Sequence, residues 1–450
     1  MKPLKNTRHI IEIENITAKG FGIGNIDGFT LFVDGALPGD KVDVHILKVK
    51  SRYGYGKIME IINPSPARVK SPCPVSIHCG GCQWQHCEYQ AQLDFKKRIV
   101  IDALERIGGI PNPPVNDVIG MENPARYRNK AVFPVVPSSS KDGFTIGMYA
   151  PRSHRIIEVK DCGIQHEAHI NVLTAVKQHM RRHKINAYDE TTHTGLMRFI
   201  MVRTSLATGE VMAVLIIKGK TLPGEREIVE SLAAQGVTTT LINIHEARGN
   251  AVLGNDFRIL SGLGHIHEHI GLIEYQISAS SFFQINPVQT KILYETAVSQ
   301  AALNDAQNAI DAHAGAGGVL LHAAKHAKSA IGIDIVPSAI NDAQKNSELN
   351  GISNTQFICG AAEEVIPELL KTEVPHVMFL DPPRKGCEAP LLDAIIAAKV
   401  PRLIYISCDP ATLARDIKIL KTGGYNLVAA QPIDMFPFTG KVEVCCLLTI

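Results

Sequence analysis

The sequence lacks a long apolar run, a leader segment and a large excess of charge. No apolar stretch approaches the roughly 18 to 20 residues that a membrane-spanning helix needs, so we expect no membrane partner. No charged segment followed by an apolar one opens the chain, which predicts a cytoplasmic location. The net charge is only +2 in 450 residues, so any nucleic-acid site must rest on a local basic patch. No obligate protein partner is evident.

The hydrophobic content of 45% is enough for large cores, and the length favours about two to four domains. Residues 8–62 alternate short β-like runs with turns, a pattern typical of a small β-barrel. The runs span 10–13, 29–33, 41–46 and 57–61. Two lysines, an arginine and two tyrosines follow the third run. They suit contact with single-stranded RNA and, equally, a solvated hairpin.

Ten cysteines without a secretory leader favour metal binding, catalysis or burial over disulfides. Four of them lie within 15 residues after the linker 63–66, and a fifth follows later: Cys73, Cys79, Cys82, Cys87 and Cys162. Two glycines between the second and third cysteines allow a short loop to wrap a metal. Four thiolates satisfy either zinc or a [4Fe-4S] cluster, and the spacing does not decide between them. Separate core cysteines are the alternative, but a polar, Gly-rich loop is unlike a core.

The residues that follow predict one amphipathic helix over 89–107 and an α+β segment over 125–283. Within the helix, Lys96, Lys97 and Arg98 form one basic turn that we expect to face solvent. In the α+β segment we expect strands near 131–136, 145–149, 155–158, 198–204, 211–217, 239–244, 251–253 and 275–279, and helices near 166–182 and 225–234.

Two polar tracts in this segment each have a functional and a structural interpretation. Arg126, Arg128 and Lys130 form a cationic cluster that suits an RNA backbone and, equally, the start of a surface strand. The tract 265–269 reads His-Ile-His-Glu-His, and alternation places its three histidines on one face of a strand, as a metal site would. With no fourth ligand in view, we favour an exposed hairpin.

A Gly-rich loop and a carboxylate indicate a nucleoside site in the C-terminal part of the chain. A helix is predicted over 288–303, and a strand ending at Asp311 leads into the Gly-rich residues 312–318. The next strand ends in Asp334, 23 residues after Asp311. This combination holds a nucleoside by its ribose hydroxyls, but it does not separate NAD from S-adenosylmethionine.

Reactive side chains follow two further predicted strands. Strands at 356–358, 376–380, 402–406, 426–431 and 442–449 continue the βα alternation of a parallel sheet. The carboxyl edge of such a sheet binds ligands, and it would hold Asp381 and Cys408. Asp409 caps a helix predicted over 411–420, so Cys408 is expected at a helix N-terminus, where the dipole favours thiolate. Cys408 is therefore a candidate nucleophile.

Several segments resemble the RNA 5-methyluridine methyltransferases of the RumA/TrmA type, and the resemblance covers nearly the whole chain. They are Ser281-Phe282-Phe283-Gln284-Ile285-Asn286, Asp381-Pro382-Pro383-Arg384-Lys385-Gly386, Ser407-Cys408-Asp409-Pro410-Ala411-Thr412 and Asp434-Met435-Phe436-Pro437-Phe438-Thr439. In addition, Gly20-Phe21-Gly22-Ile23-Gly24 and Ala36-Leu37-Pro38-Gly39-Asp40 resemble a TRAM domain, an OB-like RNA-binding module. The TRAM-like start and the cysteines favour the 23S ribosomal RNA branch, because the classical tRNA enzyme of the family lacks both.

The resemblance implies an α/β protein with three domains. A TRAM-like OB β-barrel is expected over 1–66 and a central α+β domain with the cysteines over 67–282. A Rossmann-like class I methyltransferase domain is expected over 283–450. The helix at 90–108 is expected to pack on that last domain, despite its place in the sequence.

The implied activity is methylation of uridine C5 in RNA with S-adenosylmethionine as donor. Uracil C5 is too weak a nucleophile to attack a sulfonium methyl group. A thiolate therefore adds to C6 first, and a base later removes the C5 proton. Cys408 matches that nucleophile and Glu443 the base, while Asp381 orients the uracil or the thiol. A uridine in folded RNA must also flip out to reach such a pocket.

The resemblance assigns further residues to three binding sites. The donor site would comprise Gln284, His313, Gly315, Gly318, Asp334, Ala361 and Asp381. The RNA site would include Phe282, Arg126, Arg128 and Lys130. A [4Fe-4S] cluster, with zinc as the alternative, would be held by Cys73, Cys79, Cys82 and Cys162, leaving Cys87 as an extra.

Four positions depart from the family pattern. The family usually reads Asp-Leu-Tyr/Phe-Cys-Gly where this chain has Asp311-Ala312-His313-Ala314-Gly315, so an aromatic side chain near the donor is lost. Asp334 replaces a glutamate, and Ala361 replaces an acidic or amide residue near the adenine. We therefore expect weakened but not absent donor binding. Lys441 stands where histidine is usual, beside Glu443, and is expected to lower the pKa of that carboxyl.

Two other functions fit parts of the sequence. A non-catalytic RNA-binding or RNA-chaperone protein would keep the scaffold after losing the cofactor, but the joint presence of Cys408, Glu443, Asp381 and Gln284 argues against it. An oxidoreductase would use the Gly-rich loop. That alternative leaves both motifs at the sheet edge unexplained.

Overall fold

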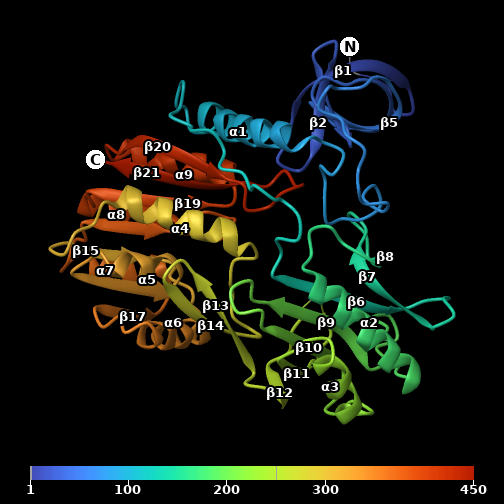
Figure 1. The fold of residues 1–450 in the computed structure, drawn as a ribbon. Coiled ribbons are helices and arrows are strands. Elements are labelled where there is room, and N and C mark those ends of the chain that lie inside the picture. Colours follow the sequence, from blue (N-terminus) through green and yellow to red (C-terminus); the bar gives the residue numbers. More distant parts are fainter. Residues whose placement is uncertain (1–2, 250) are drawn as a thin grey trace.

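The computed structural model describes residues 3–249 and 251–450. Figure 1 shows a β-barrel, a central sheet with helices on one side, and a C-terminal sheet with helices on both faces. This arrangement confirms the predicted α/β class with a small N-terminal barrel. Among the described residues, no helix is both long and apolar enough to span a membrane.

The barrel is closed by pairing between its first and fourth strands, in the order β1-β2-β3-β5-β4. Its strands are β1 (Arg8–Ile16), β2 (Phe21–Ile26), β3 (Phe29–Asp34), β4 (Lys41–Val49) and β5 (Tyr53–Asn63). The sequence did not predict β2, because glycines occupy the positions where apolar side chains would mark a strand. A Cβ at Gly22 would lie 2.8 Å from that of Ala36, and one at Gly24 would lie 2.6 Å from the Glu12 oxygen. The close approach of neighbouring strands thus requires glycine there.

The central sheet has seven strands in the order β12-β11-β10-β9-β6-β7-β8. They are β6 (Lys130–Pro137), β7 (Phe144–Tyr149), β8 (Ile156–Glu158), β9 (Met197–Thr204), β10 (Val211–Ile217), β11 (Thr239–Ile244) and β12 (Asp256–Ser261), and the helices are α2 (Glu167–Arg182) and α3 (Glu225–Ala233). β9 and β10 are buried along their whole length. One face packs on α2 and α3, and the other shares a core with the C-terminal part.

One strand prediction in this sheet was wrong. Residues 251–253 form no strand, and the chain pairs with β11 only from Asp256 onward. The Asn243 side chain explains why the strand starts later. Its amide nitrogen donates to the Gly254 carbonyl at 3.0 Å, and its amide oxygen accepts from the Gly254 N–H at 2.8 Å. An asparagine side chain thus takes the place of a backbone partner.

The hairpin predicted at 265–269 is present, with β13 (His265–Ile270) as its first strand and β14 (Ile273–Ser278) as its second. Only one of its faces is exposed, because Ile266, Ile270, Tyr275 and other apolar residues enter the core shared with the C-terminal sheet. The three histidines alternate with these buried residues. The hairpin therefore joins the central sheet to the C-terminal domain.

The C-terminal sheet follows the order β17-β16-β15-β18-β19-β21-β20. Strand β21 runs in the direction opposite to the other six, so its pairs with β19 and β20 are antiparallel. Its strands are β15 (Asn308–Asp311), β16 (Ser329–Asp334), β17 (Thr355–Cys359), β18 (Val377–Leu380), β19 (Arg402–Ser407), β20 (Asn426–Ile433) and β21 (Glu443–Thr449). Its helices are α4 (Pro287–Ala301), α5 (Gly318–Ala324), α6 (Pro337–Leu349), α7 (Ala362–Leu369), α8 (Ala389–Ala398) and α9 (Pro410–Thr422).

Side chains of β18 alternate between the two faces of this sheet, as strand geometry requires. Val377 and Phe379 pack towards α4 and α5, whereas Met378 and Leu380 pack towards α8 and α9. The strands are apolar on both faces, so polar side chains collect where the strands end.

Helix α1 (Tyr89–Arg106) lies at the β20 edge of the C-terminal sheet, beside α9, although it is far from both in sequence (Figure 1). Its Val100 and Leu104 belong to the same core as α9 and β20. The predicted basic turn is corrected at one position. Lys96 is fully buried and forms an ion pair with Asp434, whereas Lys97 and Arg98 stay at the surface.

Candidate active site

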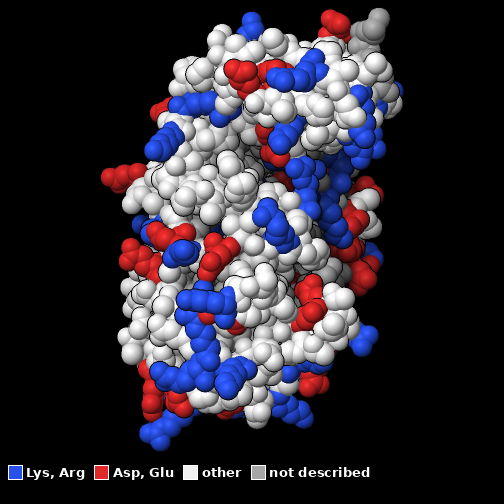
Figure 2. All heavy atoms as spheres, turned by 90° about the vertical axis from the view of Figure 1, so that its right-hand side faces the viewer, with Lys and Arg blue, Asp and Glu red and all other residues white. Residues whose placement is uncertain are grey.

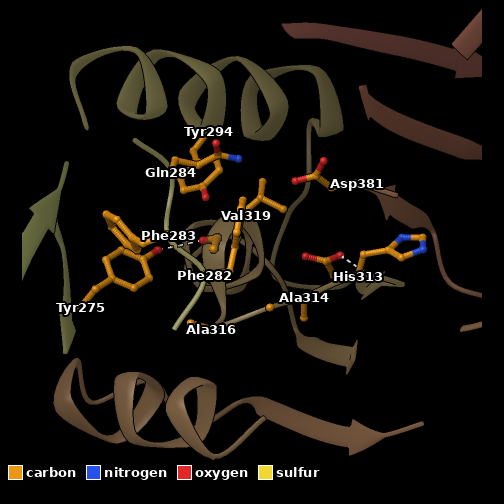
Figure 3. A pocket seen from close by; sticks show the side chains of 13 residues that line it. Tyr275, Phe282, Phe283, Gln284, Tyr294, His313, Ala314, Ala316, Val319 and Asp381 are labelled. Carbon is orange, nitrogen blue, oxygen red and sulfur yellow. Dashed lines mark hydrogen bonds between the residues drawn. The ribbon is translucent and has the colours of Figure 1, made fainter. Parts of the chain in front are cut away.

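A cavity opens at the carboxyl ends of β15 and β18, between the start of α5 and the segment that precedes α4 (Figure 3). Its lining comprises Tyr275, Phe282, Phe283, Gln284, Tyr294, Asp311, His313, Ala314, Gly315, Ala316, Gly318, Val319 and Asp381. The rings of Tyr275 and Phe283 lie on one side, with Asp381 and His313 on the other (Figure 3). Parallel α/β sheets bind their ligands at this edge.

The Gly-rich loop is fixed by hydrogen bonds to the next strand and to the hairpin. The Gly315 N–H donates to Asp334 Oδ2 at 3.0 Å, and the Val336 N–H donates to Asp334 Oδ1 at 2.8 Å. The Tyr275 hydroxyl donates to the Gly318 carbonyl at 2.8 Å. Gly315 has a φ of +54°, a backbone angle that residues with a side chain rarely adopt. The loop is thus preformed around the cavity.

Two carboxyl groups face this cavity, the buried Asp311 and the half-buried Asp381. Burial raises the pKa of Asp381 to about 7. Burial, with smaller contributions from Asp381 and Asp334, raises the pKa of Asp311 to about 8, although the His313 N–H donates to its Oδ1 at 3.0 Å. A bound cation would relieve both shifts by favouring the ionised carboxylates.

A second group of reactive side chains lies beside Asp381. Ser407 and Val444 are paired in the ladder between β19 and β21, so Cys408 follows one partner directly and Glu443 precedes the other. Glu443 is only 4% exposed, which excludes the alternative that it is an outward-facing strand residue. Asp381, Cys408 and Glu443 thus lie at the ends of three neighbouring strands, β18, β19 and β21.

The pKa of Cys408 contradicts the expectation that the helix dipole would favour thiolate. Burial, followed by the negative charges of Glu443 and Asp381, raises the pKa of Cys408 to about 11, and Arg384 opposes this shift. Asp409 explains why the N-terminus of α9 does not lower the pKa of Cys408. Its carboxylate accepts the Ala411 and Thr412 N–H groups, so the first donors of α9 are already satisfied.

Glu443 also departs from the expected direction. Burial and Asp381 raise its pKa well above the ordinary value, although Lys441 and Arg384 act in the lowering direction, as expected of Lys441. The desolvation of this carboxyl outweighs both nearby cations. A carboxyl with a raised pKa is suited to accepting and releasing a proton.

The predicted RNA-binding cations occupy different settings. Arg126 forms an ion pair with Asp161 at 2.8 Å and donates to the Cys162 carbonyl. Arg128 lies close enough to lower the pKa of Lys441, and burial lowers the pKa of Lys130 to about 7. Phe282, in contrast, is 74% exposed at the cavity rim. Ala361 is the N-cap of α7 and lies outside the cavity lining.

Four of the cysteines lie near one another. The thiols of Cys73, Cys79 and Cys162 contribute, after burial, to raising the pKa of Cys82 to about 12. Cys87 has other neighbours, among them Glu88, Arg68 and Asp40. In the part of the chain that the structure describes, no group of three or more His, Cys, Asp or Glu side chains is placed to hold a metal ion. The four thiols nevertheless form a donor set suited to zinc or to an iron–sulfur cluster.

An aromatic surface on the barrel adds a feature that sequence patterns showed only in part. Phe21, Phe32, Tyr53 and Tyr55 form one set of ring contacts with centroids 5.5 to 6.0 Å apart. Arg152, from the central domain, lies over the Phe21 ring at 5.5 Å. Partly exposed rings beside an arginine suit base stacking.

Comparison with known proteins identifies the family. A family model described as tRNA (Uracil-5-)-methyltransferase matches residues 88–450, and a TRAM domain model matches residues 8–59. The chain belongs to the tRNA (uracil-5-)-methyltransferase family. It is therefore an RNA (uracil-5-)-methyltransferase of an S-adenosylmethionine-dependent family, which confirms the resemblance inferred from its motifs.

Relatives match along almost the whole chain of this uracil-5-methyltransferase. An RNA methyltransferase of Halalkalibacterium halodurans is 43% identical over 99% of this chain and 98% of its own. One of Clostridium tetani is 42% identical over 99% of this chain and 97% of its own. The crystal structure of Pyrococcus abyssi tRNA (uracil-54, C5)-methyltransferase with S-adenosyl-L-homocysteine aligns with a TM-score of 0.78. It covers 98% of this chain and 100% of its own at 24% identity, and so supports the fold.

Sequence reasoning missed the aromatic wall of the methyltransferase cavity. Tyr275 comes from β14 and Tyr294 from α4, and neither lies in a motif that suggested a ligand. The only available signal was the spacing of apolar residues in the strand and the helix, which indicates a buried face but not a ligand site. Their position at the cavity depends on the packing of the hairpin against α4.

Proposed function

We propose that this methyltransferase modifies C5 of a uridine in 23S ribosomal RNA through a covalent intermediate on Cys408. The observation that carries the proposal is the meeting of Cys408, Glu443 and Asp381 at neighbouring strand ends, with Asp381 also lining the preformed cavity. The choice of ribosomal RNA rests on the resemblance of the TRAM-like start and the cysteine group to the 23S branch, and the tRNA enzyme of Pyrococcus abyssi, which aligns with 98% of this chain, makes tRNA the alternative substrate.

The proposed reaction begins with the Cys408 thiolate adding to uracil C6, which moves the electrons of the C5–C6 double bond to C5 as an enolate. When bound, S-adenosylmethionine supplies an electrophilic methyl group to that carbon. Glu443 then removes the C5 proton, the electron pair restores the double bond, and the C6–S bond breaks to release Cys408. Asp381, half-buried beside both groups, would hold the uracil edge.

The raised pKa values fit a site that receives a positive charge. Burial raises the pKa of Cys408, Glu443 and Asp381 and so favours their protonated forms. A cationic donor in the adjacent cavity would lower all three pKa values. Arg384 already acts on Cys408 and Glu443 in this direction.

The donor site would use the preformed Gly-rich loop. Asp334 would face the ribose, Gln284 and Asp381 the methionine part, and Asp311 the sulfonium charge, with Gly315 and Gly318 allowing close approach. His313 replaces the family's aromatic residue, and its buried Nδ1 has no hydrogen-bond partner. Ala361 offers no polar group to the adenine. The expectation of weakened donor binding stays a prediction.

RNA would approach from the side that carries the barrel. Figure 2 shows Lys and Arg side chains gathered below the barrel on this face. The aromatic surface of Phe21, Phe32, Tyr53 and Tyr55 would stack unpaired bases, while the exposed Phe282 would stack on the flipped uracil. Arg126, Arg128 and Lys130 would complete this side, and the ion pair of Arg126 with Asp161 limits how far that guanidinium can move.

The four neighbouring thiols would hold a [4Fe-4S] cluster, with zinc as the alternative. Such a centre supplies tetrahedral thiolate coordination that ties distant segments together. We expect protein purified without oxygen to be brown and to contain about four irons per chain. Cys82→Ser should lose the iron, whereas Cys87→Ser, a matched control outside the group, should retain it. A colourless protein with one zinc per chain would refute the iron assignment.

The proposed function is tested with RNA that contains 5-fluorouridine. Fluorine cannot leave as a proton, so the enzyme should remain covalently attached to the RNA after methyl transfer. We expect a donor-dependent adduct, stable on a denaturing gel, with a 23S ribosomal RNA transcript and none with a tRNA transcript. An adduct only with tRNA would refute the substrate assignment. No adduct with either RNA would refute the mechanism.

A further inference from the structure

The loop that leads into Glu443 is held by residues from outside the C-terminal sheet. It spans 434–442, between β20 and β21. Its first residue, Asp434, accepts a hydrogen bond from the Tyr89 hydroxyl at 2.8 Å and forms a fully buried ion pair with Lys96. The same lysine donates to the Phe436 carbonyl at 3.1 Å. Two residues of α1 thus fix the beginning of this loop.

A second attachment lies at Phe438, in the middle of the loop. Its N–H donates to Gln92 Oε1 at 2.9 Å, and its carbonyl accepts the N–H groups of Gln83 and Trp84, each at 3.0 Å. The fully buried Gln92 also donates to the Cys87 carbonyl at 2.9 Å. Gln92 therefore connects the loop to the segment that carries three of the four neighbouring cysteines.

The remainder of the loop has little freedom. The Phe438 backbone has a φ of +64°, an unusual value for a bulky residue. At Gly440 a Cβ would lie 2.6 Å from the Ala18 carbonyl oxygen of the barrel. The Lys441 N–H donates to Thr439 Oγ1 at 3.2 Å, and β21 begins two residues later with Glu443. The clamp at Phe438 thus lies five residues from the proposed base.

Cys408 is held independently of this clamp. It lies in the turn between β19 and α9, where Ser407, Asp409 and the helix cap form the local hydrogen bonds. None of the hydrogen bonds of Lys96 or Gln92 that the structure describes reaches this turn. The sheet ladder pairs Glu443 with Ile433 and Val444 with Ser407, so the clamp acts on the chain immediately before Glu443. A disturbance of the clamp will therefore free residues 434–442, which lead into Glu443, while the turn of Cys408 keeps its own hydrogen bonds.

We propose that Lys96 and Gln92 are positioning residues for the proton-removal step. They fix the 434–442 loop so that the Glu443 carboxylate reaches the C5 proton of the methylated adduct. This inference rests on the proposed function. Addition of Cys408 to C6 does not need the clamp, whereas removal of the C5 proton and release of Cys408 do. The cysteine segment is then a structural part of the active site.

The test measures how the reaction divides between adduct formation and adduct resolution, using natural uridine RNA. For Gln92→Ala we expect adduct formation within about twofold of the original enzyme and resolution about 10- to 100-fold slower, so the adduct accumulates. Lys96→Met should give the same pattern, and its thermal unfolding is measured in parallel because it leaves the buried Asp434 without its cationic partner, with only the Tyr89 hydrogen bond described above. Tyr425→Phe, which removes a buried hydroxyl that donates to the Val400 carbonyl far from the loop, is the matched control.

The outcomes separate this inference from the proposed function. If Gln92→Ala slows formation and resolution by the same factor, or leaves both unchanged, the positioning role is refuted. The same holds if Tyr425→Phe accumulates adduct to the same extent. If the original enzyme forms no adduct with fluorinated RNA, the proposed function fails first, whatever the variants do.

Discussion

Replacing Cys408 with alanine will abolish the covalent RNA adduct and lower methyl transfer by on the order of 10⁴-fold or more. Without the thiolate, uracil C5 gains no negative charge and cannot attack a methyl group. Cys408 is the thiol that lies beside both Glu443 and Asp381. The measurement is transfer of a radiolabelled methyl group to RNA, together with adduct formation on 5-fluorouridine RNA.

Cys359→Ala provides the control for this prediction. Cys359 is an exposed thiol at the end of β17, outside the site proposed for the uracil. The control variant should keep both the adduct and most of the activity. An undiminished adduct in Cys408→Ala would show that another group attacks the RNA.

Replacing Glu443 with glutamine will stop the reaction after methyl transfer, with natural uridine RNA as substrate. The amide cannot accept the C5 proton, so turnover should fall by roughly 10²- to 10⁴-fold while the covalent adduct persists on a denaturing gel. Loss of turnover without adduct accumulation would place Glu443 in the addition step instead. Turnover within tenfold of the original enzyme would exclude it as the base.

The pH dependence of adduct resolution tests the role of Glu443 as the base by a second, independent measurement. Burial and Asp381 raise the pKa of Glu443, so its carboxylate forms only at a pH above the usual range for glutamate. Only the ionised form accepts a proton, and the rate of adduct resolution should therefore rise with pH across that range. Glu443→Gln should lose this dependence. A flat profile in the original enzyme would contradict the assignment.

The order of the elements and the position of the reactive turns could be predicted from the sequence because they depend on local patterns. Apolar runs followed by Asp311, Asp381 and Cys408 mark strand ends, and the carboxyl edge of a parallel sheet brings such ends together. The sequence pattern of an N-cap residue followed by proline likewise predicted where α4 and α9 begin. Their caps, Asn286 and Asp409, are both observed.

Features that depend on contacts between distant residues could not be predicted in this way. Lys96 lies among charged residues in sequence, and only the folded chain brings Asp434 to it. The pKa of Cys408 depends on burial and on Glu443, neither of which a helix-start pattern reveals. Strand β2 was hidden by glycines whose role appears only when Ala36 packs against them.

Trp84, the single tryptophan of the chain, gives the protein an intrinsic fluorescent probe of domain assembly. Its fully buried ring lies 6.1 Å from that of Phe95 on α1, 3.2 Å from where a Cβ of Gly440 would lie, and in one small core with Ile16 of the barrel. Indole emission depends on exposure to water. In unfolding experiments its wavelength will therefore report the separation of barrel, helix and catalytic loop, without any label and independently of the C-terminal sheet.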